Sequence, residues 1–225
     1  MPTSRYERAA RKAGYRVIAG LDEAGRGSLF GPVFAAAVVL HPDRPIRGLD
    51  DSKALLPERR EVLAGRIRER ALAWAVGAAD AFEIDRINIY QASLAAMKRA
   101  LAALTAACDY LLLDAVKLDV PMDQKSLIHG DALSFSIAAA SILAKTHRDA
   151  ALRQWDAIFP EYGLADNKGY STPDHLAALE RLGPTSVHRF SFEPVRRSSR
   201  SPYPLWTGYP EAEPETTQGE LFACP

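Results

Sequence analysis

AGLDEAGRG, residues 19–27, decides how this sequence folds and what it can do. The stretch begins as the end of an apolar segment, continues with two adjacent acids, Asp22 and Glu23, and finishes with an arginine between two glycines. Neighbouring side chains of a strand point to opposite faces, so one acid of the pair is expected to point inward, where an unpaired charge is costly. The pair therefore favours a functional site over an ordinary strand end.

Apolar segments around this motif predict a central sheet. Strands are expected over residues 16–22, 33–40, 73–80 and 110–115. The first two would pair as a hairpin through the turn GRGSLFGP. Helices are expected over residues 57–73, 83–107 and 134–159, with a further helix beginning near Thr172. This order predicts an α/β fold with a central mixed β-sheet flanked by helices and a helical C-terminal portion.

The composition is that of an ordinary globular chain, with 225 residues, 48% hydrophobic and 25% charged. Lys plus Arg and Asp plus Glu are 28 each, but residues 201–225 contain four acids and no Lys or Arg, which leaves a net charge of +4 for residues 1–200. This mild basic bias fits a polyanionic partner. We find no signal peptide and no apolar run that would span a membrane, and therefore expect a cytoplasmic protein. We also expect it to be a monomer. The two cysteines predict neither a disulfide framework nor a zinc site.

A second strand also ends in an acid, because Asp114 closes the segment LLLD. If the two strands lie side by side, Asp22 and Asp114 meet at one edge, where Glu23 adds a third carboxylate and Asp131 a fourth. Clustered carboxylates raise one another's pKa, and hard oxygen ligands suit Mg²⁺ or Mn²⁺. Two such ions roughly 4 Å apart can bind the attacking and leaving oxygens of a phosphodiester. One acid alone would more often be solvated or cap a helix, so the prediction depends on the set.

Glycines and basic residues support a phosphate-bearing ligand. The glycines of Gly25, Arg26 and Gly27 allow the backbone to approach a ligand closely. Ser52 and Lys53, in a loop before a helix, are candidates for contact with a phosphate. The ordinary alternative for these two residues is a helix cap.

Two further candidates come from later segments. Lys145 and Arg148, three residues apart, share one face of the long helix; the alternative is a solvated helix face. Tyr170 lies in the glycine-containing loop NKGYSTP, where an aromatic ring can stack on a sugar or a base. An isolated tyrosine of this kind more often takes part in packing.

Taken together, the motifs resemble those of type 2 ribonuclease H, and most closely those of bacterial ribonuclease HII. They occur in the family's order over about residues 16–197 as AGLDEAGRGSLFGPVFAAAVVL, GLDDSKAL, EIDRINIYQASLAAM, LLLDA, GD, SIAAASILAKTHRD and NKGYSTPDH. The resemblance implies a ribonuclease H-like catalytic domain over residues 16–197, after a basic N-terminal extension of residues 1–15. It also implies cleavage of RNA in RNA–DNA hybrids, and nicking 5′ of single ribonucleotides in duplex DNA with 5′-phosphate and 3′-hydroxyl ends.

By position, the resemblance implies that the catalytic, metal-binding acids are Asp22, Glu23, Asp114 and Asp131, with Mg²⁺ or Mn²⁺ as cofactor. Asp149 competes for the fourth place. Asp131 is preferred because the family's fourth acid precedes the long helix, whereas Asp149 lies about three turns inside it. Backbone atoms of residues 25–27 and the hydroxyl of Tyr170 would contact the 2′-hydroxyl group, which distinguishes RNA from DNA.

The sequence departs from the family pattern at three positions. Ser28 and Phe30 stand where proline and alanine are common, and Phe30 is expected to alter the packing behind the 2′-hydroxyl contact. Ala115 follows Asp114 where glycine is common, which restricts the backbone. None of the departures removes a proposed catalytic residue.

Residues 198–225 form an acidic, proline-rich segment that we expect to be a disordered tail. Within it, QGELF resembles the peptide by which bacterial replication and repair proteins bind the sliding clamp, with Gln218, Leu221 and Phe222 as the contact residues. Gly219 departs from that pattern. One alternative function is a non-catalytic or weakly catalytic nucleic-acid-binding module recruited to replication sites through the tail. Another is ribonuclease HIII, whose usual N-terminal domain is not matched by the roughly 15 residues before the first strand.

Overall fold

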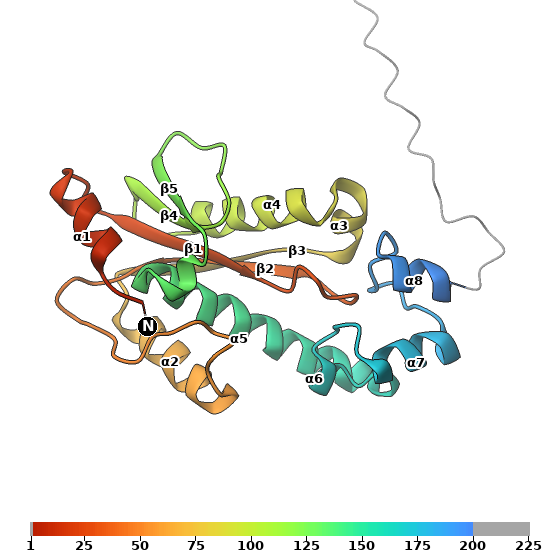
Figure 1. The fold of residues 1–225 in the computed structure, drawn as a ribbon. Helices are drawn as coiled ribbons and strands as arrows, with labels where there is room; N and C mark the ends of the chain where they lie inside the picture. Colours follow the sequence, from red (N-terminus) through yellow and green to blue (C-terminus); the bar gives the residue numbers. More distant parts are fainter. Residues whose placement is uncertain (1, 200–225) are drawn as a thin grey trace, which may run out of the picture.

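The computed structural model of the chain describes residues 2–199. Five strands form one mixed sheet in the order β3-β2-β1-β4-β5 (Figure 1). Their bounds are β1 Ile18–Ala24, β2 Val33–Val39, β3 Ala73–Ala79, β4 Tyr110–Asp114 and β5 Asp123–Leu127. Antiparallel pairing joins β1 to β2 and β2 to β3, while β1 with β4 and β4 with β5 are parallel. The predicted mixed sheet and its opening hairpin are confirmed.

Helices cover both faces of this sheet, with α4 on one face and α5 on the other (Figure 1). The helices are α1 Arg5–Lys12, α2 Pro57–Arg70, α3 Ala81–Ile87, α4 Ile89–Ala102, α5 Phe135–Ile158, α6 Leu164–Asn167, α7 Pro173–Leu182 and α8 Glu193–Ser198. Two 3₁₀ turns, η1 Gly130–Ala132 and η2 Pro160–Tyr162, precede and follow α5. The predicted helical C-terminal portion therefore corresponds to α6, α7 and α8.

Two glycines bring the main helices close to the sheet. A Cβ atom at Gly20 of β1 would lie 2.1 Å from the backbone carbon of Ser136 in α5. A Cβ atom at Gly77 of β3 would lie 2.3 Å from the carbonyl oxygen of Ala96 in α4. Side chains of any size at these positions would push the helices away, so the alanine-rich faces of α4 and α5 pack directly on the strands.

The turn between β1 and β2 belongs to a separate core at the C-terminal end of the fold. Leu29 and Phe30 pack there against Leu152 at the end of α5, Tyr162 of η2 and Leu179 of α7. This packing fixes residues 25–31, which continue the acid-bearing strand, against the C-terminal helices. Tertiary contacts with α5, η2 and α7 therefore hold this loop in place.

The helix expected over residues 83–107 is interrupted. Asn88 adopts a left-handed φ of +67° and separates α3 from α4, and its side chain accepts a hydrogen bond from the backbone N–H of Gln91 at 3.1 Å. Strand β5 was not predicted, because its sequence DQKSL lacks an alternation of apolar residues. It is an exposed edge strand that forms by pairing with β4. Tertiary pairing, which a local pattern does not contain, decides β5, whereas the backbone conformation and cap of Asn88 decide the helix break.

Helix α1 lies in the segment expected to be an extension. The Oε1 atom of Glu7 accepts hydrogen bonds from the Ser134 hydroxyl at 2.7 Å and from the Ser136 backbone N–H at 2.9 Å. Ala10 of the same helix face packs with Ile18 and Ile137. The helix therefore binds to the start of α5. Within residues 2–199, no helix has the length and apolar character needed to cross a membrane.

Candidate active site

The sheet brings the predicted acids to one edge. Leu21 of β1 pairs with Leu113 of the parallel strand β4, so the next residues lie on neighbouring strands, Asp22 two residues before the end of β1 and Asp114 as the last residue of β4. The backbone N–H of Gly130 donates a hydrogen bond to Oδ1 of Asp114 at 2.6 Å. This bond fixes η1, and with it Asp131, beside the ends of the strands.

Burial and mutual repulsion shape the charge of this cluster. Burial raises the pKa of Asp22 well above its usual value, and the neighbouring Glu23 and Asp114 raise it further. Burial also raises the pKa of Glu23, against the opposing effect of Arg26, whose Nη1 lies 3.3 Å from Oε1. Burial followed by nearby carboxylates raises the pKa of Asp131. A positive charge placed beside these carboxylates would therefore stabilise their ionised forms.

The donor set suits a hard divalent cation. All four side chains offer carboxylate oxygens, and Oε2 of Glu23 is buried with no hydrogen-bond partner among the described residues. However, no three carboxylate, imidazole or thiol groups within residues 2–199 already surround one point as metal ligands. Oδ1 of Asp114, for example, is engaged by Gly130. The residues fit such an ion in chemistry and charge, and side-chain rotation would be needed to bind it.

A groove of about 560 Å³ opens beside Glu23. It brings together most of the predicted substrate contacts, namely Gly25, Arg26, Gly27, Ser52, Lys53, Lys145 and Tyr170. Arg60 and Ser141 also line it and were missed from the sequence. The signal for Arg60 was its place among the apolar residues of α2, on a face that carries Leu63 and Ile67. A basic residue on a buried helix face needs an anionic partner.

Loop 50–55 supplies the groove with positive charge. Burial acts to lower the pKa of Lys53, but the carboxylates of Asp51, Asp22 and their neighbours outweigh it and raise that pKa. Lys53 therefore stays charged. Ser52 is almost fully buried, and its hydroxyl oxygen accepts a hydrogen bond from the hydroxyl of Ser141 at 2.8 Å. This bond connects the loop to α5.

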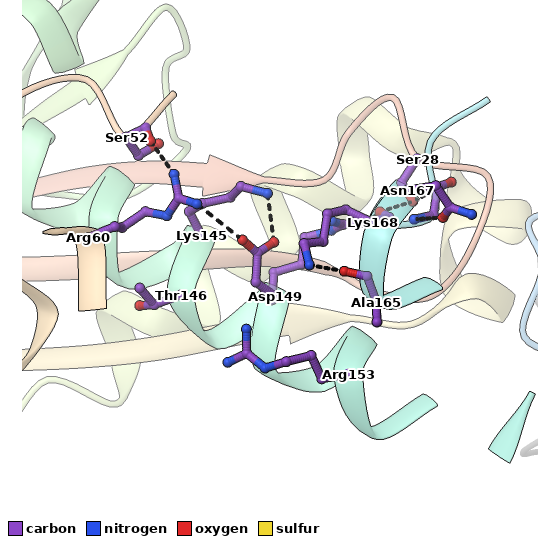
Figure 2. Close-up of polar contacts among 12 residues, drawn as sticks. Ser28, Ser52, Arg60, Lys145, Thr146, Asp149, Arg153, Ala165, Asn167 and Lys168 are labelled. Carbon is purple, nitrogen blue, oxygen red and sulfur yellow. Dashed lines mark hydrogen bonds and ion pairs between the residues drawn. The ribbon is translucent and has the colours of Figure 1, made fainter. Parts of the chain in front are cut away.

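Asp149 lies apart from the acid cluster. Figure 2 shows its carboxylate between two cations, with Lys145 Nζ at 2.6 Å from Oδ1 and Arg60 Nη2 at 3.5 Å from Oδ2. Arg60 also donates to the carbonyl oxygen of Ser52. Asp149 thus neutralises and orients the basic residues on one wall of the groove, which supports the choice of Asp131 over Asp149 as the fourth acid.

Residues 25–27 and Tyr170 face each other across one end of the groove. Gly25 has a φ of +97°, and a Cβ atom there would lie 2.0 Å from Nε of Arg148. At Gly27 a Cβ atom would meet the ring of Tyr170 at 3.9 Å. The structure therefore gives each glycine a steric reason, and for Gly25 a conformational reason as well.

Arg148 does not share the open face expected for it with Lys145. It is 1% exposed, and its guanidinium carbon lies 5.3 Å from the centre of the Tyr170 ring. It donates a hydrogen bond to the carbonyl oxygen of Lys168 at 2.8 Å. The sequence-based expectation of direct substrate contact is corrected, because packing beneath Gly25 and Tyr170 leaves the arginine no accessible surface. Its role is to support Gly25 and Tyr170 from below.

The departures from the family pattern have structural counterparts. The buried Ser28 hydroxyl lies 3.0 Å from the carbonyl oxygen of Gly169, which also accepts a hydrogen bond from Leu29, so the two loops are joined. Phe30 packs edge-on against His188, with ring centres 4.8 Å apart. Ala115 adopts a left-handed φ of +51°, a conformation that glycine adopts at lower cost.

Comparisons with known proteins agree with this arrangement. The ribonuclease HII family profile matches residues 19–195. A ribonuclease HII of Solibacter usitatus is 62% identical over 196 residues, which cover 87% of this chain and 86% of the relative, and one of Enterococcus faecalis is 52% identical over 193 residues, covering 86% and 76%. The crystal structure of ribonuclease H2 from Pyrococcus horikoshii OT3 superposes with a TM-score of 0.71 at 25% identity, covering 81% of this chain and 97% of that one.

The fold is that of the type 2 ribonucleases H, a class of hydrolytic endonucleases. Within that class, the chain belongs to the ribonuclease HII family. The protein is accordingly an endoribonuclease that cleaves RNA in RNA–DNA hybrids. The predicted family and enzyme class are confirmed.

Proposed function

We propose that this ribonuclease nicks duplex DNA on the 5′ side of a single embedded ribonucleotide, in addition to cleaving RNA–DNA hybrids. The observation that carries the proposal is the groove itself, which residues 25–27 and Tyr170 line together with Glu23. A contact to one 2′-hydroxyl group would then lie in the same groove as Glu23 of the acid cluster. We call residues 25–27 and Tyr170 the ribose-contact residues.

Asp22, Glu23, Asp114 and Asp131 would hold the divalent cation, Mg²⁺ or Mn²⁺. The support is the buried, unpartnered Oε2 of Glu23 and the raised pKa of Asp22 that burial and two carboxylates produce. When bound, such an ion supplies a nucleophilic water and stabilises the charge that develops on the phosphate and the leaving oxygen. The protein's own part is to concentrate negative charge where the ion binds.

The basic wall of the groove would orient the phosphate backbone. Lys53 remains charged beside the acids, and Lys145 is held by Asp149 at 2.6 Å. Phosphate contacts of this kind fix register without sequence preference. They would place one phosphodiester at the acids while the ribose-contact residues examine the neighbouring sugar. Cleavage there leaves a 5′-phosphate and a 3′-hydroxyl end.

The test is cleavage of an end-labelled DNA duplex that contains one ribonucleotide, with Mg²⁺, with Mn²⁺ and with neither. We expect one nick, 5′ of the ribonucleotide, only when a cation is present, and ligation after annealing should confirm the nature of the ends. An all-DNA duplex of the same sequence is the matched control and should stay intact. Cleavage of the hybrid without any cleavage of the single-ribonucleotide duplex would refute the proposal.

A further inference from the structure

A short segment, residues 185–189, runs behind both loops that carry the ribose-contact residues. It pairs with the turn after β1, because the backbone N–H of Arg189 donates to Leu29 and that of Gly31 donates to Val187, both at 2.9 Å. His188 and Arg189 are fully buried and do not line the groove. Each belongs to a hydrogen-bonded path that ends on a ribose-contact residue.

The first path passes through His175 of α7. Its Nδ1 atom lies 2.9 Å from the carbonyl oxygen of Tyr170, which can only accept, so Nδ1 carries the hydrogen. Burial lowers the pKa of His175 and keeps its ring neutral. A neutral ring with a hydrogen on Nδ1 has its lone pair on Nε2. His175 therefore needs a donor on its far side.

His188 provides that donor. Its Nε2 lies 3.2 Å from Nε2 of His175, so Nε2 of His188 carries a hydrogen and its Nδ1 must accept. The other nitrogen of the ring leads to the same tautomer independently, because the backbone N–H of Thr185 donates to Nδ1 of His188 at 3.0 Å. A single tautomer of each ring satisfies the whole chain from Thr185 to the Tyr170 carbonyl.

Aromatic packing holds the rings in place. Phe30 meets His188 edge-on, and Tyr162 lies against His188 with ring centres 5.0 Å apart. Burial and the neighbouring His175 lower the pKa of His188 to about 3, so the ring is neutral under ordinary conditions. The path is thus a fixed connection and carries no charge.

The second path is direct. Nε of Arg189 donates to the carbonyl oxygen of Gly31, and Nη1 donates to the carbonyl oxygen of Arg26, both at 2.9 Å. Arg26 is the middle residue of the backbone that would contact the 2′-hydroxyl group. One side chain therefore fixes both ends of the turn.

We propose that His188 and Arg189 are positioning residues that set the two ribose-contact elements relative to each other, His188 through His175 and Tyr170, and Arg189 through the Arg26 carbonyl. The inference rests on the proposed role of residues 25–27 and Tyr170. Because His188 and Arg189 are adjacent in the chain, they move together. The distance between residues 25–27 and Tyr170 is therefore preserved.

The test compares kcat/KM for two substrates of one sequence, a DNA duplex with one ribonucleotide and a continuous RNA–DNA hybrid. Only one register on the first substrate satisfies the ribose contacts, whereas the hybrid offers many. Loss of folded protein lowers both values equally, so their ratio reports positioning. His175→Leu and Arg189→Lys should lower the single-ribonucleotide value by roughly tenfold relative to the hybrid, the effect of one buried hydrogen bond.

Two variants separate positioning from packing. His175→Asn keeps an amide donor for the Tyr170 carbonyl where Nδ1 stood but ends short of His188, so it should lower the ratio as loss of the bond between the two rings does. Tyr162→Phe removes a hydrogen bond from Tyr162 to Gly183 in the same core, and should leave the ratio unchanged. If His175→Leu fails to fold, His188→Asn keeps the acceptor for Thr185 but removes the donor to His175, and should lower the ratio instead.

The variant Tyr170→Ala, alone and combined with His188→Asn, distinguishes failure of this inference from failure of the proposed ribose contact. In the Tyr170→Ala variant, His188→Asn should cause no further loss, because its path ends at Tyr170. An unchanged ratio in His175→Leu or His188→Asn, with a lowered ratio in Tyr170→Ala, would overturn this inference alone. Fully additive losses would also overturn it. An unchanged ratio in Tyr170→Ala would refute the proposed ribose contact, and the inference with it.

Discussion

Asp22 combines, in one residue, a buried carboxylate with two negatively charged neighbours. Its side chain is 5% exposed, and burial followed by Glu23 and Asp114 raises its pKa. For an acid with a raised pKa in the folded state, stability is highest at low pH and falls as pH rises from the unfolded-state pKa through the folded-state value. At neutral pH without a cation, Asp22 therefore opposes folding, because the folded state must either bury its negative charge or take up a proton.

Asp22→Asn should separate function from stability. Cleavage should fall by at least about 100-fold, the scale on which loss of a well-placed electrostatic group acts. Urea unfolding at pH 7 in a chelator should show an equal or higher free energy of unfolding, because the variant removes a buried charge. Duplex binding, measured by anisotropy, should persist. Unchanged turnover, or a clear loss of stability, would contradict this account of the site.

Gly25→Ala tests why glycine stands in the turn after β1. Gly14 has a similar φ of +106° with no atom within 4 Å of an added Cβ, so Gly14→Ala is a matched control that measures conformational strain, about 1–2 kcal/mol. Gly25→Ala must in addition displace Arg148, which should cost a further ~1–3 kcal/mol. Chemical denaturation measures both, and equal losses would show that the contact with Arg148 is unimportant.

At the scale of elements, the break between α3 and α4 depends on one residue. Asn88 both adopts a left-handed φ and caps α4 through Gln91. A hydrophobic pattern that continues through residue 88 contains no information on this break, which is why one helix was expected from the sequence. The break allows α4 to lie along the sheet while α3 packs at its edge (Figure 1).

Asn88→Ala should therefore lower the free energy of unfolding by about 2 kcal/mol, with cap loss and left-handed strain contributing about equally. Asn88→Gly tolerates the backbone conformation and should cost only a few tenths of a kcal/mol. Thermal or urea unfolding of the two variants is the measurement. Equal destabilisation by both would show that the side-chain cap, and not the backbone conformation, is decisive.

At the scale of the whole molecule, the proposed partner site lies at Gln218, Leu221 and Phe222, outside the described residues. The proposal that they bind the sliding clamp stays a prediction from the sequence. A chain that ends at Arg200, or the double change Leu221→Ala and Phe222→Ala, should weaken retention on immobilised bacterial clamp at least about tenfold. Thr217→Ala lies just outside the motif and serves as the control. Retention of the shortened chain at the level of the full chain would exclude this site.

Much of the site could be predicted because its information is local. Asp22, Glu23 and Asp114 directly follow apolar residues that identify two strands, and parallel pairing of β1 with β4 then brings them together. The pattern that identifies each strand lies within a few residues of the acid, which is why these acids could be named from the sequence.

Other parts depended on contacts between distant segments. Arg148 follows Lys145 by three residues, yet one is buried beneath Gly25 and the other lines the groove. Likewise, β5 exists because β4 offers an edge. Such outcomes depend on what packs against a residue, which helical spacing or composition does not specify.

The sequence by itself determined the mixed sheet, the hairpin, the long helix and the acids at the strand ends, because strand and helix periodicity and a family pattern encode them locally. Only the tertiary structure decided that Asp149 binds Arg60 and Lys145, and that His175 and His188 connect residues 185–189 to Tyr170. The reason is physical: a buried polar group takes the partner that folding brings to it, and the partners are distant in the chain, 89 residues apart for Ser52 and Ser141 and 163 apart for Arg26 and Arg189.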